Sequence, residues 1–62
     1  MPMKDTDFIK LLKKNGWTED HVTGSHHIMY KKGYPTLSVP VHGTDLRVGI
    51  FKKLMKQAGL DK

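Results

Sequence analysis

"TLSVPV", residues 36–41, carries the clearest structural signal in the sequence, because apolar and polar side chains alternate along it. This alternation predicts a β-strand with one buried face, formed by Leu37, Val39 and Val41. Pro40 cannot donate a backbone hydrogen bond, so we expect its end of the strand to lie at a sheet edge or beyond the pairing. The buried face requires other elements to cover it.

Two shorter strands are predicted before this one. The segment "HHIMYK", residues 26–31, is β-branched and aromatic in character and ends at the glycine and proline of "KKGYP". "WTEDHVT", residues 17–23, gives a weaker strand signal and ends at a turn formed by Gly24 and Ser25. Three consecutive strands with short turns between them form an antiparallel meander.

An amphipathic helix is predicted before the strands, from about residue 5 to 15. In "DTDFIKLLKKNGW", Phe8 is followed at three and four residues by further apolar side chains, with lysines opposite. Asp5 or Thr6 can accept hydrogen bonds from the free N–H groups of the first turn. Gly16 suits the left-handed position after the last turn.

A second amphipathic helix is predicted after the strands, in "LRVGIFKKLMKQAGL". Gly59 is placed to end it. Its apolar stripe consists of Val48, Phe51, Leu54, Met55 and Ala58.

The element order α-β-β-β-α predicts an α+β fold in a single domain, residues 1–62. Both helices need an apolar surface, and the simplest arrangement packs them on one face of a three-stranded antiparallel sheet. The other face is then left to solvent or a ligand.

The chain is strongly basic for its length. Eleven Lys and Arg against six Asp and Glu give 62 residues a net charge of +5, and the pI is near 9.7. A pI above ~9 in a small domain is typical of nucleic-acid binding, although an acidic protein surface would also be electrostatically complementary to this chain. The expected RNA-phosphate contacts are adjacent pairs, Lys13 and Lys14, Lys31 and Lys32, and Lys52 and Lys53.

Two of the four histidines, His26 and His27, follow a Gly-Ser pair in "GSHHIMY". Neighbouring strand residues point to opposite faces, so these two cannot share one metal ion without a bulge, and the chain has no cysteine. We therefore expect neither a metal nor another cofactor. RNA cleavage requires fewer protein groups than a metal site, because the substrate carries its own 2′-hydroxyl nucleophile. A histidine, which titrates near pH 6.5, serves as acid or base. The alternative is that both are ordinary strand residues.

Four segments resemble, in order and spacing, the HicA-type messenger-RNA interferase toxins of prokaryotic toxin–antitoxin pairs. They are "FIKLLKKNGW", "GSHHIMY", "VPVHG" and "LRVGIFKKLMKQAGL". The resemblance covers roughly residues 7–60, and the combination is more specific than the Gly-Ser-His motif alone.

The resemblance implies a fold like the double-stranded-RNA-binding domain, in agreement with the element order. It implies ribonuclease activity centred on the histidine after Gly-Ser, which is His26. Gly24 would be the turn residue that lets RNA approach the backbone. The implied partners are messenger RNA and a HicB-like antitoxin that covers the site in a hetero-oligomer.

The chain departs from the family pattern before its last helix. It has Gly49-Ile50 where the family commonly has Gly-Thr, and Val48 where proline is common. A threonine hydroxyl there could cap the helix or touch phosphate, and isoleucine can do neither. This departure bears on the phosphate contact and the helix start, but not on the histidine motif.

The other polar residues near the motifs receive lesser expectations. His27 is the alternative candidate for the catalytic histidine; strand alternation places it on the face opposite His26, although a bulge after the turn would reverse the two. Ser25 is expected to position the catalytic histidine or the phosphate. His42 is either a substrate contact or a loop residue without a role, and His21 is interpreted as a surface residue.

The sequence thus predicts the toxin of a type II pair, a metal-independent endoribonuclease that uses a histidine to cleave messenger RNA and block translation. Two alternatives stay open: a small basic RNA-binding module without catalysis, and an interaction protein whose basic surface meets an acidic antitoxin. Neither a signal peptide nor a membrane span is expected, which makes the cytoplasm the default location.

Overall fold

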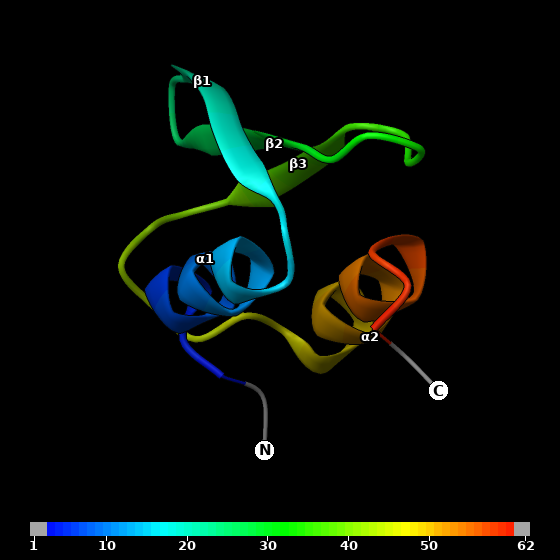
Figure 1. Ribbon diagram of the computed structural model, residues 1–62. Helices are drawn as coiled ribbons and strands as arrows, with labels where there is room; N and C mark the ends of the chain where they lie inside the picture. Colours follow the sequence, from blue (N-terminus) through cyan, green and yellow to red (C-terminus); the bar gives the residue numbers. More distant parts are fainter. Residues whose placement is uncertain (1–2, 61–62) are drawn as a thin grey trace.

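The structure, a computed structural model, describes residues 3–60. The strands form one antiparallel sheet, and both helices lie on the same face of it (Figure 1). The predicted α+β architecture, with the layout of a double-stranded-RNA-binding domain, is confirmed. In chain order the elements are α1 (Asp5–Lys14), β1 (Thr18–Thr23), β2 (His26–Tyr30), β3 (Leu37–Pro40) and α2 (Val48–Gln57).

The central strand of the sheet is β2, with β1 and β3 at its sides. Its register places His26 opposite Pro40 and Ile28 opposite Ser38. These four residues share the face turned away from the helices, here called the open face, because alternate residues such as Met29 are buried on the helix side. Pro40 ends an edge strand, as its missing N–H group requires.

The pairing of β1 with β2 contains a β-bulge. Glu19 lies opposite Met29, but the next pair along the chain is His21 with Ile28, so Asp20 is an extra residue on β1. A bulge reverses the side-chain alternation of the strand that contains it. His21 therefore lies on the open face, where strict alternation from Glu19 would place it on the helix side.

The hydrophobic core lies between the sheet and the two helices. Phe51 is half-buried and packs edge-on against Phe8, with the ring centroids 5.8 Å apart. The buried apolar side chains are Phe8, Ile9, Leu12, Trp17, Met29, Leu37, Val39, Leu46, Leu54 and Ala58. Leu37, Val39 and Phe8 are thus buried as predicted, whereas Val41, predicted for the same strand face, follows the end of β3 and is half-buried.

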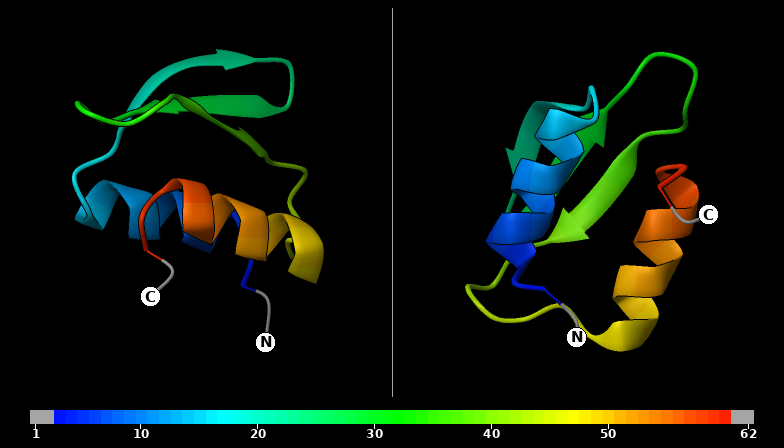
Figure 2. Two further views of the ribbon diagram at one scale, coloured as in Figure 1. Left: turned by 90° about the vertical axis from the view of Figure 1, so that its right-hand side faces the viewer. Right: turned by 60° about the horizontal axis from the view of Figure 1, so that its bottom comes forward.

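The helix starts differ from the sequence expectation. Asp5 does not cap the first turn of α1; it is the first helical residue, and its side chain turns toward the loop after β3. Thr6 donates its own N–H to Asp5. Val48, predicted to be buried, is 51% exposed because the first turn of α2 extends beyond the sheet (Figure 2).

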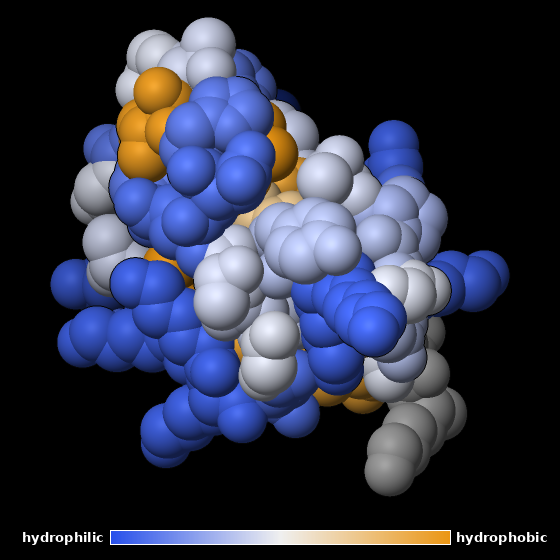
Figure 3. Space-filling model, turned by 45° about the horizontal axis from the view of Figure 1, so that its top comes forward, coloured by the Kyte–Doolittle hydropathy of each residue, from blue (hydrophilic) through white to orange (hydrophobic). Residues whose placement is uncertain are grey.

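Both helices end as predicted, at glycines with left-handed backbone. Gly16 has φ +91° and Gly59 has φ +73°. Each helix has ten residues, and within residues 3–60 no helix is long and apolar enough to cross a membrane. The surface seen in Figure 3 is largely hydrophilic, with small separate apolar areas between the polar side chains.

Candidate functional site

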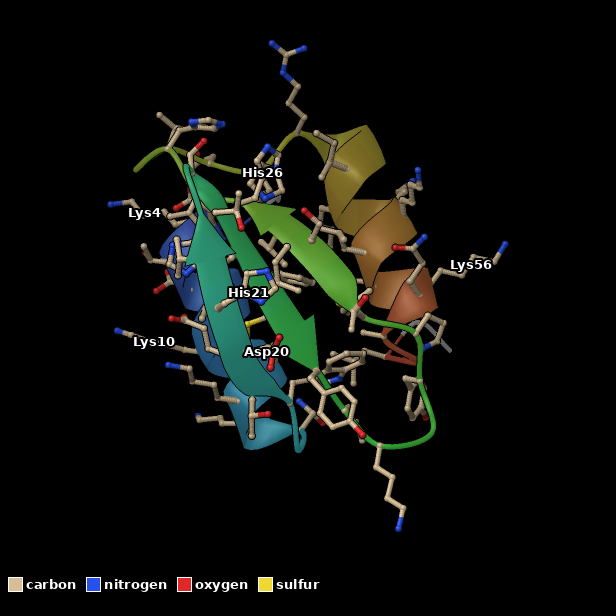
Figure 4. The ribbon with its side chains drawn as sticks, turned by 90° about the horizontal axis from the view of Figure 1, so that it is seen from above. Lys4, Lys10, Asp20, His21, His26 and Lys56 are labelled. Atoms are coloured by element: carbon tan, nitrogen blue, oxygen red, sulfur yellow. The ribbon has the colours of Figure 1, made fainter. Side chains whose placement is uncertain are left out.

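His26 stands at the first position of β2, on the open face of the sheet. Its side chain is exposed, and Figure 4 looks down on this face. The ring atom Nδ1 lies 3.3 Å from the hydroxyl oxygen of Ser38 on β3. Because a hydroxyl both donates and accepts, Ser38 can hold Nδ1 in either protonation state. That contact leaves Nε2 of His26 to exchange a proton with a substrate.

The Gly24-Ser25 turn fixes the start of β2. Gly24 has φ +59°, and a Cβ built on it meets nothing within 4 Å, so the left-handed backbone rather than crowding favours glycine. The carbonyl of Ser25 accepts a hydrogen bond from the N–H of Val41, with an N···O distance of 2.7 Å. This bond ties the residue before His26 to the end of β3.

His27 lies on the other face of the sheet, as strand alternation predicts. It pairs in register with the buried Val39. Its Nδ1 lies 3.0 Å from a carboxylate oxygen of Glu19, and both side chains are about two-thirds buried or more. A sheet thus separates His27 from His26, and the two do not converge on one site.

The loop after β3, which carries His42, is held by the buried carboxylate of Asp5. One oxygen of Asp5 accepts hydrogen bonds from the backbone N–H groups of His42, Gly43 and Thr44, at 2.7, 3.0 and 3.3 Å. Burial raises the pKa of the Asp5 carboxyl, but these donors and the N–H of Thr6 lower it, and the net pKa lies below the ordinary 3.8. Asp5 is therefore an ionised anchor for the loop.

A cleft of about 370 Å³ opens beside this loop, with His42, Arg47 and Ile50 in its walls. Pro40 also lines it and is the register partner of His26, so the cleft begins at the His26 end of the sheet. Ile50, where the family commonly has threonine, makes an apolar part of the wall.

A second cleft, of about 390 Å³, runs between β3 and α2 and shares Pro40 and Ile50 with the first. Ser38, which contacts His26, lines it together with Lys53. We call the two adjoining clefts the β3–α2 groove. Arg47 lines the first cleft together with Asp5 and Asp45, Lys53 lines the second, and His26 stands beside the groove.

The predicted lysines are not gathered in one patch. Of the six, Lys53 lines the β3–α2 groove. Lys13 and Lys14 end α1, on the helix side of the sheet. Lys31 is half-buried, with its ammonium 4.9 Å from the ring centre of Tyr34. Figure 4 shows other lysines, Lys10 and Lys56, extending beyond opposite sides of the sheet.

Three polar residues at the site were missed by the sequence analysis or were given no role. Ser38 and Arg47 reach the site through strand register and loop geometry, which no local motif encodes. His21 was interpreted as a surface residue and is exposed, yet the bulge places it on the same face as His26. Among residues 3–60, no group of three or more His, Cys, Asp or Glu side chains is arranged to hold a metal ion.

Comparisons with known proteins agree with this fold. A solved chain from a toxin-antitoxin complex of Streptococcus pneumoniae matches with a TM-score of 0.82 and 32% sequence identity, over 95% of this chain and 100% of that chain. A search of curated proteins gives no match. The family model described as the HicA toxin of bacterial toxin-antitoxin matches residues 6–60, nearly the whole sequence. The chain therefore belongs to the HicA toxin family.

Proposed function

We propose that this toxin is a metal-independent endoribonuclease that cleaves single-stranded messenger RNA at a site centred on His26. The observation that carries the proposal is the setting of that histidine. It is exposed on the open face, held by Ser38 and placed beside the β3–α2 groove, in a chain of the HicA family.

The attack of the 2′-oxygen needs a general base and positive charge near the phosphate, and these residues supply both. His26 acts as general base and takes the proton of a ribose 2′-hydroxyl through Nε2. The 2′-oxygen then attacks the adjacent phosphorus and the phosphorus–5′-oxygen bond breaks, which gives a 2′,3′-cyclic phosphate and a departing 5′-oxygen that takes up a proton to become a hydroxyl. Cationic side chains can stabilise the charge on the phosphate oxygens, so the reaction requires no metal ion.

The β3–α2 groove is the proposed path of the RNA backbone toward His26. Arg47 can hold one phosphate through its planar guanidinium, and Lys53 can hold another as a point charge. His42 lines the same groove and is a proposed substrate contact. The open turn at Gly24 lets a strand of RNA approach the backbone, and Ser25 positions His26 through its bond to Val41.

The remaining lysines extend the electrostatic attraction for RNA without reading its sequence. The proposed contacts are Lys13, Lys14, Lys31, Lys32 and Lys52. Each lysine–phosphate contact releases counterions, so the affinity for RNA falls as salt rises.

A HicB-like antitoxin is the proposed partner, with an acidic surface that covers the open face and excludes RNA from His26. The net charge of +5 favours such a partner. The similar solved chain comes from a toxin-antitoxin complex, which supports a hetero-oligomer. A messenger-RNA substrate places the site of action in the cytoplasm.

The test is a cleavage assay on a long unstructured RNA, with the toxin freed of any partner and a chelator present. Wild type is compared with His26→Ala and with the adjacent His27→Ala, which removes an imidazole from the opposite face. General acid–base catalysis contributes typically 10²–10⁴-fold, so we expect a loss of at least about 100-fold for His26→Ala with RNA binding retained. His27→Ala should cleave within a few-fold of wild type.

Three outcomes would overturn the proposal. If wild type binds RNA without shortening it, the chain is an RNA-binding module. If it shows no affinity for RNA once the antitoxin is removed, it is an interaction protein. If cleavage depends on His27 rather than on His26, or needs added magnesium, the proposed site or mechanism is wrong.

A further inference from the structure

The bulge in β1 turns a second histidine onto the face that carries His26. If side chains alternated strictly from Glu19, which lies on the helix side, His21 would also point to the helix side. Bulges are enriched next to active sites, where they re-aim a side chain. No residue of β1 belongs to the buried core, so the irregularity acts on the two surfaces of the strand, and on the open face it aims His21.

His21 is held by a carboxylate. Its Nδ1 lies 2.8 Å from Oδ2 of Asp20, with the two side chains 57% and 59% exposed. An exposed ion pair of this kind adds little to stability. It does orient the ring: an Nδ1–H that donates to the carboxylate leaves Nε2 to act on a substrate.

The sheet register sets the spacing between the two histidines. His21 lies opposite Ile28, two residues along β2 from His26 on the same face. The backbone positions of such diagonal neighbours are about 7–8 Å apart. In-line attack places the 2′-oxygen and the leaving 5′-oxygen on opposite sides of phosphorus. A base and an acid must therefore stand apart by the width of a phosphate and two hydrogen bonds of about 2.6–3.2 Å each, which this spacing allows.

The strand order places His21 where the RNA would continue. A chain that leaves the β3–α2 groove and crosses His26 on β2 passes next over β1. Tyr30 also carries an O–H group and lies on the open face, but it is four residues along β2 from His26, about 13 Å at 3.3 Å per residue. It is too far away to share one phosphodiester with His26.

We propose that His21 is the general acid of the reaction, an inference that rests on the function proposed for His26. His26 accepts the proton of the 2′-hydroxyl, the 2′-oxygen–phosphorus bond forms, and the phosphorus–5′-oxygen bond breaks. The imidazolium of His21 donates its Nε2 proton to the departing 5′-oxygen, which leaves as an alcohol. Asp20 is a positioning residue that orients the His21 ring.

The test uses one short oligoribonucleotide made with either of two scissile linkages, the natural phosphodiester or a linkage with sulfur in place of the 5′-oxygen. A thiolate leaves without protonation, because thiols are far more acidic than alcohols. We expect His21→Ala to slow cleavage of the natural linkage by about 10²–10⁴-fold and that of the sulfur linkage by less than about threefold. His26→Ala should slow both linkages, and Asp20→Asn should show a smaller loss with the same rescue.

The outcomes separate this inference from the function on which it rests. If wild type cleaves through His26 and His21→Ala cleaves the natural linkage at the wild-type rate, the inference fails and the proposed function stands. The inference is also overturned if His21→Ala slows cleavage of both linkages equally, or if the sulfur linkage restores cleavage by His42→Ala instead of by His21→Ala. If wild type cleaves neither substrate, the proposed function itself fails. Circular dichroism checks that each variant is folded.

Discussion

Removal of the Asp5 carboxylate tests how the loop after β3 is held. In Asp5→Ala, the backbone N–H groups of His42, Gly43 and Thr44 lose an acceptor that binds them at 2.7, 3.0 and 3.3 Å. A hydrogen bond to a charged group contributes about 1.5–3 kcal/mol. The loop is exposed, so hydrogen bonds to water can replace part of this contribution. We expect the free energy of unfolding of the variant to fall by about 3 kcal/mol, near the value of the two shorter bonds.

That loss is large for a chain of 62 residues. At roughly 0.05–0.15 kcal/mol per residue, the whole free energy of unfolding is about 3–9 kcal/mol. Small domains lose about 4–8 °C of melting temperature per kcal/mol, which corresponds to a fall of about 12–24 °C. Asp5→Ala should therefore be partly unfolded at 37 °C.

The assay is urea and thermal unfolding followed by circular dichroism at pH 7. Asp7→Ala is the matched control, because Asp7 is an exposed acidic residue in the same first turn of α1. Its loss should be at most about 1 kcal/mol, from the helix dipole. If the two variants differ by less than about 1 kcal/mol, the carboxylate does not anchor the loop and the reasoning is refuted.

The same anchor predicts a dependence of stability on pH. The pKa of Asp5 in the folded state lies below its ordinary value of 3.8, so the unfolded chain binds the proton more tightly. The contribution of Asp5 is present above about pH 4 and is lost as the pH falls through the folded-state pKa. The gap in unfolding free energy between wild type and Asp5→Asn should narrow from pH 5 to pH 2. A constant gap would contradict this assignment.

Four further variants test the backbone and the groove. Gly59→Ala should lose about 1–3 kcal/mol in urea unfolding, because φ is +73° and the new Cβ would lie 3.0 Å from Tyr34. Gly49→Ala, with ordinary helical backbone and open space, should gain about 0.5–1 kcal/mol, and equal effects of the two would refute the backbone argument. When RNA affinity is measured against salt concentration, Lys53→Ala should reduce the slope of log K against log [salt] by about one. Lys52→Ala, outside the groove, should reduce this slope less. Equal slopes for the two variants would argue against the groove as the RNA path.

The layers of the fold could be predicted from local pattern. Leu37 and Val39 are two residues apart in a strand, so a period of two was enough to identify them as inward-facing, and both are buried. The same rule separated His26 from His27. Each of these predictions depends on neighbours within a few residues, which is the range over which side-chain period carries information.

The arrangement of the site depends on longer-range contacts. Asp5 or Thr6 was expected to cap the first helix, but three of the four N–H groups that donate to the Asp5 carboxylate belong to residues 37 to 39 positions away. The contact between Ser38 and His26 depends on the register of two strands, which alternation alone does not set. The bulge at Asp20 is a further irregularity of register, and without it the face occupied by His21 is assigned wrongly.

The proposed chemistry and the core occupy opposite faces of one sheet. His26 and Ser38 are exposed, whereas Met29 and Val39 behind them are buried, so truncation of a site residue leaves no core cavity. Site variants should therefore fold, and a loss of cleavage in them can be assigned to chemistry. The weak element is β1, an edge strand that contributes no residue to the buried core and pairs with β2. An RNA or antitoxin that binds only the folded open face stabilises this strand by mass action, and binding there should add stability that a chain of this size otherwise lacks.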